Sequence, residues 1–420
     1  MKTIRKKLCI CLAGLMLLLA PQAVTADVVT DWNAIMQSKV ATPATNVFFQ
    51  TRNAAITQLA VFEAVNAIIG DYEPYLGMIS AAPGASPEAA AVAAAHRVLS
   101  ALYPVPPLMG PTLDDLRDAS LAALPDGAAK ASGIAVGIAA ADAMLALRST
   151  DGANTPLQYT FGTNPGDWQL APGNVAPVLP GWGLVKTFGI EDGTQFRASP
   201  PPLLNTGKYA RDLDEVREVG MLNSSSRPSD RTDVAKVFVT LTVVNLYSPI
   251  ARQLSGIQGK TLSENARLFA LLAMAGADGV ISSMESKFHY NLWRPVTAIR
   301  SAHLDGNAKT TAEPTWEPLV GTPSFPSYPS NHASLAGASL TVLQEVFGNS
   351  GHNFSLPAVG GVVLNYSVLS DIADDIDDAR VFGGIHFRFD QEAGAKMGRQ
   401  VGQYILQHEL RPLHGGQSKP

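Results

Sequence analysis

The sequence predicts a mainly α-helical protein with a long irregular loop near its middle. Apolar residues recur at helical spacing in nearly every periodic stretch, and the alternation typical of strands is scarce. Of the 420 residues, 46% are hydrophobic and only 16% are charged, which indicates a globular chain with a large buried core.

The first part of the chain is expected to hold a series of helices. The segment from Asn53, "NAAITQLAVFEAVNAI", has apolar residues at helical spacing. The next helix begins at Ser86, whose hydroxyl can cap it, and stops at Pro104. Two further helices fit residues 112–124 and 128–147.

The second part of the chain is also predicted to be helical, after a long segment of different composition. Between Ser149 and Pro202, Gly, Pro, Asn, Thr and Trp dominate and helical periodicity disappears, as in a functional loop or a surface connector. The chain therefore divides into an N-terminal helical half, 27–207, which contains the loop 149–202, and a C-terminal helical half, 208–420. Helices in the C-terminal half are predicted at 208–220, 231–253, 263–293, 332–347 and 387–408.

Residues 1–26 have the pattern of a secretory signal peptide. Four positive charges precede an apolar run over residues 8–20, and Val-Thr-Ala at 24–26 offers a cleavage site. The alternative is an N-terminal anchor helix, for which the run is short. We expect cleavage after Ala26 and a periplasmic or secreted protein. No later run approaches the roughly 18 apolar residues of a membrane span, so we expect no stable span after cleavage.

Cleavage would also change the chemistry available to the protein. It removes both cysteines, Cys9 and Cys11, so the mature chain has no disulfide and no thiolate site for a metal or haem. It removes four cations and no anion, which moves the formal charge from −5 to −9. An acidic chain without a basic tract is a poor candidate for binding nucleic acid.

The stretch "KFHYNLWRP" is the first of three segments with residues suited to an anion site. Lys287 and Arg294 are seven residues apart, so we expect them to project from nearly one face of a helix that ends near Pro295. Two cations on one face suit an anion. The alternative is the solvated end of an amphipathic helix.

The second segment is "PSNHASLAG". Ser330, Asn331 and His332 stand where a turn is expected to enter a helix. Free backbone N–H groups at such a helix start, with the helix dipole behind them, bind phosphate-like anions. The alternative is that the side chains of Ser330 and Asn331 simply cap the helix.

The third segment is "RVFGGIHFRFD". His386 and Asp390 are expected at positions i and i+4 of the helix that runs on to His408. The carboxylate can fix the tautomer of the imidazole and leave its other nitrogen free to attack or ligate. The glycine pair at 383–384 lets the backbone turn, so Arg380 can reach the same point. An isolated pair of this kind is more often structural.

Together the three segments supply three cations, helix-start amides and two histidines, an inventory that suits a tetrahedral or trigonal-bipyramidal oxyanion. Their order and spacing resemble the motifs of the vanadium-dependent haloperoxidase and type 2 phosphatidic acid phosphatase superfamily: Lys-x6-Arg-Pro, Pro-Ser-Gly-His and Ser-Arg-x5-His-x3-Asp. Here Asn331 replaces the Gly and Ala379 the Ser. The sequence is similar to the bacterial haloperoxidase-like branch over most of the mature chain. The resemblance implies two four-helix-bundle-like units, with catalysis in the C-terminal half.

The haloperoxidase branch implies a vanadate cofactor whose vanadium is coordinated by His386, and oxidation of halide by hydrogen peroxide. His332 would handle protons and Lys287 would polarise the peroxide. Phe325 matches a position near the halide pocket, although core packing is an equal alternative. Met284 stands where some haloperoxidases have an aromatic residue. The residues implied to hold the oxyanion are Lys287, Arg294, Ser330, Asn331 and Arg380.

Two other functions remain open. As a secreted acid phosphatase without cofactor, the protein would hydrolyse phosphate monoesters through a phosphohistidine at His386, with Asp390 as its orienting group and His332 as general acid. As a non-catalytic oxyanion-binding protein, it would need neither histidine. The sequence also leaves open a homo-oligomer and a cation on the acidic face at 371–378.

Overall fold

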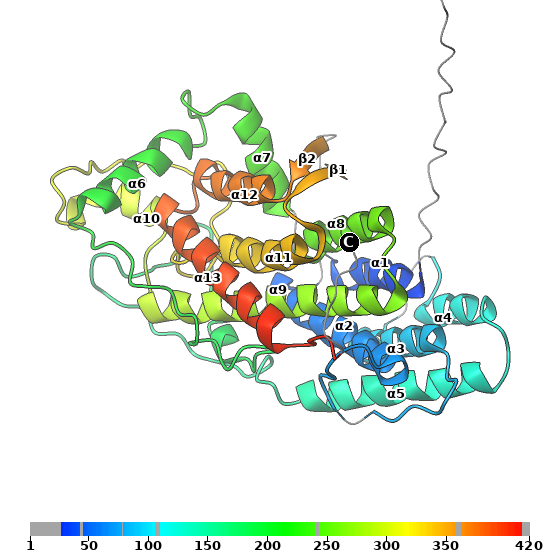
Figure 1. The fold of residues 1–420 in the computed structure, drawn as a ribbon. Helices are drawn as coiled ribbons and strands as arrows, with labels where there is room; N and C mark the ends of the chain where they lie inside the picture. Colours follow the sequence, from blue (N-terminus) through cyan, green and yellow to red (C-terminus); the bar gives the residue numbers. More distant parts are fainter. Residues whose placement is uncertain are drawn as a thin grey trace, which may run out of the picture.

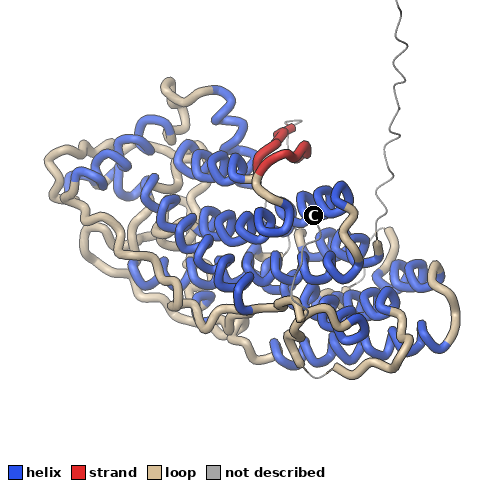
Figure 2. Tube along the Cα trace, viewed as in Figure 1, coloured by secondary structure: helices blue, strands red, loops and turns tan. Residues whose placement is uncertain are grey.

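The computed structural model describes residues 27–42, 45–77, 79–105, 110–240, 243–357 and 363–413. The predicted signal peptide, with both cysteines, lies outside these residues. The described chain is mainly helical (Figures 1 and 2), as the sequence predicts. The predicted division at residue 208 stays a prediction, and one cluster of buried apolar side chains extends from Val29 to Leu410.

The helices of the N-terminal half pack closely, with α2, α3 and α5 side by side (Figure 1). Ser86 caps α3 as predicted, because its hydroxyl accepts from Ala89 N at 3.1 Å. Gly137 of α5 lets the two backbones approach, since a Cβ there would lie 2.3 Å from Ala90 O. The helices are α1 (Val28–Val40), α2 (Val47–Ile69), α3 (Pro87–Leu102), α4 (Leu113–Ala122) and α5 (Ala128–Arg148).

The C-terminal half contains α6 (Gly207–Val219), α7 (Ser229–Thr240), α8 (Val243–Gln258), α9 (Leu262–Tyr290), α10 (Pro295–Arg300), α11 (Asn331–Phe347), α12 (Ser370–Phe382) and α13 (Arg388–His408). The single helix predicted at 231–253 is wrong, since α7 and α8 are separate helices. The stretch from 237 to 244 is rich in β-branched residues, which lower helix propensity. The antiparallel hairpin of β1 (Ser350–Pro357) and β2 (Val363–Val368) was not predicted either.

Helix α9 is the central element and carries one of the predicted site segments. It packs against α2 on one side and against α11 and α13 on the other (Figure 1). Its N-terminus is fixed by a capping box in which Thr261 and Glu264 each accept from the other's backbone N–H. Helices α11 and α13 meet closely at Gly398, where a Cβ would lie 1.8 Å from Ser334 O. This contact fixes the start of α11 relative to α13.

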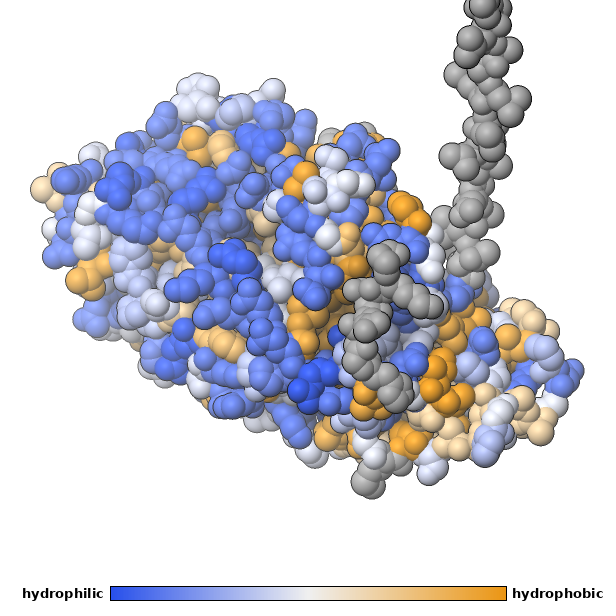
Figure 3. All heavy atoms as spheres, viewed as in Figure 1, coloured by the Kyte–Doolittle hydropathy of each residue, from blue (hydrophilic) through white to orange (hydrophobic). Residues whose placement is uncertain are grey.

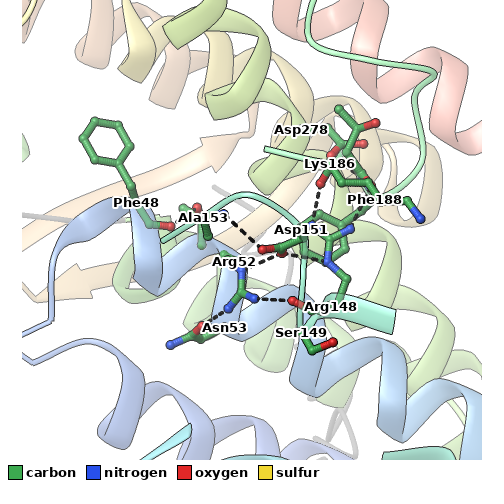
Figure 4. Close-up of polar contacts among 12 residues, drawn as sticks. Phe48, Arg52, Asn53, Arg148, Ser149, Asp151, Ala153, Lys186, Phe188 and Asp278 are labelled. Atoms are coloured by element: carbon green, nitrogen blue, oxygen red, sulfur yellow. Dashed lines mark hydrogen bonds and ion pairs between the residues drawn. The ribbon is translucent and has the colours of Figure 1, made fainter. Parts of the chain in front are cut away.

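The loop between α5 and α6 is irregular as predicted, with one short 3-10 helix, η1 (Trp182–Leu184). The loop is bound tightly to the helices at two points. The carboxylate of Asp278 on α9 accepts from the backbone N–H groups of Phe188, Gly189 and Ile190 at 2.7, 2.7 and 3.0 Å. Arg148, at the end of α5, donates to the carbonyl oxygens of residues 186 and 187 (Figure 4).

Among the described residues, two helices, α5 and α9, are long and apolar enough to cross a membrane, judged by length and composition alone. If the bent pair α7–α8 is counted as one span, there are three candidates. The sequence pattern predicts no span after residue 26. The apolar stretch of α9 is 89% buried inside the protein, and that of α5 is 33% buried. On the face in Figure 3, apolar residues gather over the region of α3 to α5, whereas the region of α6, α12 and α13 is mostly hydrophilic.

Candidate active site

Lys287 lies in the last turn of α9, and its ammonium group is fully buried. The Nζ atom donates to Pro326 O at 3.0 Å and to Ser327 O at 2.6 Å, so the lysine is tied to the loop that leads into α11. Of its three donors, two are used by these carbonyls. The third is free to meet an anion.

Arg294 does not share a helix with Lys287, contrary to the prediction. Helix α9 ends at Tyr290 because Asn291 adopts a left-handed conformation, with φ of 54°. The hydroxyl of Tyr159, from the central loop, donates to the side chain of Asn291. Pro295 therefore starts α10 instead of ending α9, and Arg294 is its extended N-cap residue.

The guanidinium of Arg294 nevertheless reaches the predicted histidine. It is fully buried and donates to Phe325 O and Ile385 O, both at 2.8 Å. Its Nη1 lies 3.1 Å from Nε2 of His386, and because arginine can only donate, this nitrogen must accept. The structure thus brings the first and third segments together.

His386 and Asp390 are paired, but not as two residues of one helix. Helix α13 begins at Arg388, so His386 precedes it. Asp390 is the third residue of α13, and its Oδ2 accepts from Nδ1 of His386 at 2.7 Å and from Phe387 N at 3.1 Å. One carboxylate therefore caps the helix and orients the imidazole.

This pairing fixes which nitrogen of His386 is available. The carboxylate of Asp390 accepts, so Nδ1 carries the proton and Nε2 keeps its lone pair. Oδ2 also accepts from Oγ of Ser327 at 2.6 Å. Sequence reasoning missed Ser327, although it lies only three residues before Ser330. Its hydroxyl holds the carboxylate and so helps to orient the imidazole.

The second segment stands at the start of α11, as predicted. Ser330 is the N-cap residue and accepts from Ala333 N at 3.3 Å, which confirms the capping interpretation for Ser330, whereas Asn331 is the first residue of the helix. Its own N–H donates to Asp390 O at 2.9 Å, which ties α11 to α13. Gly394 of α13 permits this approach, because a Cβ there would lie 2.4 Å from Ser330 O.

Arg380 is almost fully buried in the last turn of α12. Its Nη1 donates to Phe238 O at 3.3 Å. The chain then turns at Gly384, whose φ of 78° requires glycine, and leads to His386. His332 is partly exposed, and it is the predicted catalytic group nearest to solvent.

Burial and mutual repulsion set the charges of this site. Burial lowers the pKa of Arg294 to about 9 and that of Arg380 to about 10. Burial, and then the charges of Arg294 and Arg380, lower the pKa of Lys287. Burial and the three cations hold the pKa values of His332 and His386 well below their ordinary range, so both imidazoles are neutral. Burial raises the pKa of Asp390, against the hydrogen bond from Ser327 and the charge of Lys287.

The buried donors of this cluster fit an oxyanion such as vanadate or phosphate. Among the described residues, Nη2 of Arg294 and Nε of Arg380 are buried without a hydrogen-bond partner. Leaving a buried charged donor unpaired is costly, so such groups indicate a missing acceptor. A tetrahedral oxyanion offers several acceptor oxygens at once, and Nε2 of His386 offers the lone pair that a vanadium centre would need.

Phe325 forms an apolar wall beside these cations. Its ring centroid lies 5.4 Å from Nζ of Lys287 and 5.0 Å from Cζ of Arg294. The N-terminal half contributes to the same wall, since Phe48 of α2 lies 5.8 Å from Phe325 and 5.6 Å from Trp182, measured between ring centroids. The halide-pocket residue suggested by the sequence is therefore next to the cation cluster.

Two carboxylates of the acidic face at 371–378 are paired with cations or a hydroxyl of the chain. Asp375 accepts from Arg231 and from the hydroxyl of Tyr366, both at 2.7 Å, and Asp378 accepts from Arg388 at 3.0 Å. Within the part of the chain that the structure describes, no group of three or more His, Cys, Asp or Glu residues is placed to hold a metal ion.

Comparisons with known proteins find similarity in sequence and in fold. Residues 267–415, within the predicted C-terminal half, match the family model of the VCPO second helical-bundle domain. The vanadium chloroperoxidase of Curvularia inaequalis is 26% identical over 184 residues, a region that covers 36% of this chain and 30% of that protein. In sequence, the likeness to vanadium haloperoxidases is thus found in the C-terminal half and spans about a third of the chain.

Two solved bacterial vanadium-dependent haloperoxidases have the same fold over nearly the whole chain. A bacterial vanadium-dependent iodoperoxidase superposes with a TM-score of 0.78 at 22% identity, covering 92% of this chain and 98% of that one. An apo bacterial vanadium-dependent chloroperoxidase gives a TM-score of 0.69 at 18% identity, covering 86% and 95%. At these identities the likeness concerns the fold alone.

Proposed function

We propose that this protein is a vanadate-dependent haloperoxidase that oxidises halide with hydrogen peroxide. One observation carries the proposal: three buried cations surround a neutral histidine whose Nε2 holds a lone pair, and two of the cations keep unpaired N–H groups. The match of residues 267–415 to the VCPO second helical-bundle domain, and the similarity to a vanadium chloroperoxidase, favour vanadate as the oxyanion.

Each residue then has a defined task. His386 would ligate the cofactor through Nε2, and Asp390 and Ser327 keep that nitrogen unprotonated and correctly aimed. Arg294, which now donates to Nε2, would turn its donors to oxyanion oxygens. The other groups proposed to hold those oxygens are Lys287, Arg380, the Ser330 hydroxyl and the backbone N–H of Asn331.

Bound vanadate supplies a redox-inactive Lewis acid that makes hydrogen peroxide electrophilic toward halide. The chain must supply the proton chemistry and exclude water. His332 is neutral and partly exposed, so it can take a proton from peroxide and exchange it with solvent. Lys287 would polarise the peroxide, and Phe325 would give the halide a partly desolvated position.

The same arrangement also suits a phosphatase. A His386 imidazole with Nδ1 held by Asp390 is a competent nucleophile for phosphoryl transfer, and the three cations would stabilise the transferring group. A single experiment separates the two functions, because vanadate supports one and inhibits the other.

The test divides one metal-free preparation into two parts. One part receives vanadate, hydrogen peroxide and iodide or bromide, and the other receives a phosphate monoester. We expect halide oxidation that requires vanadate and disappears in His386→Ala. Ester hydrolysis that vanadate inhibits, without halide oxidation, would replace this proposal with the phosphatase.

We also propose that the protein acts in the periplasm or outside the cell. The charged and apolar pattern of residues 1–26 and the lack of cysteine after Cys11 support this proposal. Fractionation of the producing cell, with N-terminal sequencing of the mature protein, would test it. A cytoplasmic protein that retains Met1 would contradict it.

A further inference from the structure

Asn331 departs from the glycine of the superfamily motif, and its side chain has a defined place beside the cations. It is the first residue of α11, directly after the capping Ser330. The residue is 8% exposed, and its Nδ2 donates to Sδ of Met284 at 3.3 Å. Met284 lies on α9 one helical turn before Lys287, so the two residues share a face. The carboxamide therefore lies between the start of α11 and the part of α9 that carries Lys287.

The orientation of this carboxamide follows from the chemistry of its partner. A thioether sulfur has no proton and can only accept, so it pairs with the amide nitrogen and would repel the amide oxygen. The oxygen, Oδ1, is consequently directed away from the sulfur. It is buried and has no hydrogen-bond partner among the described residues.

Acceptors are few in a cluster made mainly of donors, and Asn331 Oδ1 and Asp390 Oδ1 are the two buried, unpaired side-chain oxygens that the described residues place there. Lysine and arginine side chains only donate, and the backbone N–H groups of the helix start also donate. An oxyanion in the cluster would have its bare oxygens satisfied by these donors. An oxygen that carries a proton would need an acceptor, and the buried Oδ1 of Asn331 is one beside that helix start.

We propose that Asn331 is a specificity-determining residue whose Oδ1 accepts a hydrogen bond from an O–H group of the bound oxyanion. Met284 acts as a positioning residue, because its sulfur holds the amide nitrogen and so directs the oxygen. This proposal rests on the oxyanion site of the proposed function and adds a preference for oxyanions that carry a proton. Vanadate and phosphate carry a proton near neutral pH, whereas sulfate carries none.

Inorganic phosphate and sulfate are the probes, because they have similar size and shape and differ in the O–H group. Calorimetric titration of the metal-free protein at neutral pH gives the affinity for each ion without any assay of activity. We expect the wild-type protein to prefer phosphate. Loss of one hydrogen bond in Asn331→Ala should weaken phosphate binding about tenfold and leave sulfate binding nearly unchanged.

Further variants separate recognition from structure. Asn331→Gly restores the superfamily residue and should lose the preference in the same way, which provides a second variant if alanine disturbs the helix start. Met284→Leu keeps the volume but removes the sulfur, so it should reduce the preference by a smaller factor. Ser339→Ala is the matched control, since it removes a buried and unpaired hydroxyl farther along the same helix.

The outcomes are distinguishable. A loss of phosphate affinity with sulfate affinity retained supports the proposal. An equal change for both ions, or no change, in Asn331→Ala and Asn331→Gly would overturn it while leaving the oxyanion site intact. If the wild-type protein binds neither ion, both this proposal and the oxyanion site of the proposed function are wrong.

Discussion

Two groups of buried cations lie in this protein, and they differ in how fully the chain pairs them. One is the cluster of Arg52 and Arg148 around Asp151, at the junction of α2, α5 and the central loop (Figure 4). The other is the cluster of Lys287, Arg294 and Arg380 around His386. We call them the structural cluster and the oxyanion cluster.

The structural cluster is complete. Arg52 Nε and Arg148 Nε donate to the same oxygen of Asp151 at 2.7 and 3.0 Å. The remaining nitrogens of both arginines donate to carbonyl oxygens or to the side chain of Asn53, and Arg148 stacks on Phe188 at 3.7 Å. None of these atoms belongs to the unpaired buried groups of the described residues.

In the oxyanion cluster, by contrast, several buried polar atoms have no hydrogen-bond partner among the described residues. Arg294 Nη2, Arg380 Nε, Asp390 Oδ1 and Asn331 Oδ1 are buried and unpaired. Three cations share one carboxylate there, and their repulsion contributes to the lowered pKa values of Lys287 and the histidines. Burial of charge alone does not indicate function, because both clusters are buried. The oxyanion cluster differs from the structural cluster in its unpaired donors, and unpaired buried donors are what we expect of a ligand site.

The largest effect is expected from Asp151→Ala in the structural cluster. It leaves two buried arginines without a counter-charge and should lower the free energy of unfolding by about 3–5 kcal/mol. Urea denaturation measures this change. Asp142→Ala is the control, because its pair with Arg97 is about half exposed and should cost less than about 1 kcal/mol. Equal losses in the two variants would contradict the account of the structural cluster.

The opposite pattern is expected from Arg380→Met in the oxyanion cluster. Removing a buried and incompletely paired cation relieves repulsion, so the free energy of unfolding should stay the same or rise. Phosphate binding should weaken by roughly 10- to 100-fold, because hydrogen bonds to charged groups contribute about 1.5–3 kcal/mol. Arg411→Met removes an exposed cation as a control and should change neither property. A large loss of stability in Arg380→Met would make this cluster structural too.

The protein should take up protons when it binds an oxyanion. Sulfate is the probe for this proton uptake, because the charge of sulfate is constant from pH 5 to 9. Burial and the cations lower the pKa values of His332 and His386, and a bound dianion offsets that repulsion and raises them. The complex then holds more protons than the free protein, so affinity falls as pH rises through the pKa values of the complex. The sulfate affinity can fall by at most about tenfold per pH unit for each proton taken up on binding. Affinity that rises with pH would contradict this linkage.

The sequence predicts the members of the oxyanion cluster better than their geometry. Motif spacing identifies Lys287, Arg294, Arg380 and His386, and the capping pattern at Ser330 is local enough to place the start of α11. The helix boundaries near the site could not be predicted, because Asn291 in a left-handed conformation and Asp390 as a cap depend on contacts with distant segments.

The structural cluster could not be predicted at all from one sequence. Arg52 and Asp151 are separated by 99 residues, and the central loop that completes their pairing has no periodicity. The contact of Met284 with Asn331 depends in the same way on how α9 packs against α11. Motifs and caps formed by residues close in sequence can be predicted from the sequence. Pairs formed across the core between distant segments can be identified only from the fold.

The most direct test is a calorimetric titration of the metal-free protein with vanadate, with halide oxidation measured at each occupancy. We expect one vanadate per chain, oxidation of iodide or bromide that rises in proportion to occupancy, and loss of both in His386→Ala. No vanadate binding, or binding and oxidation that persist without His386, would contradict it.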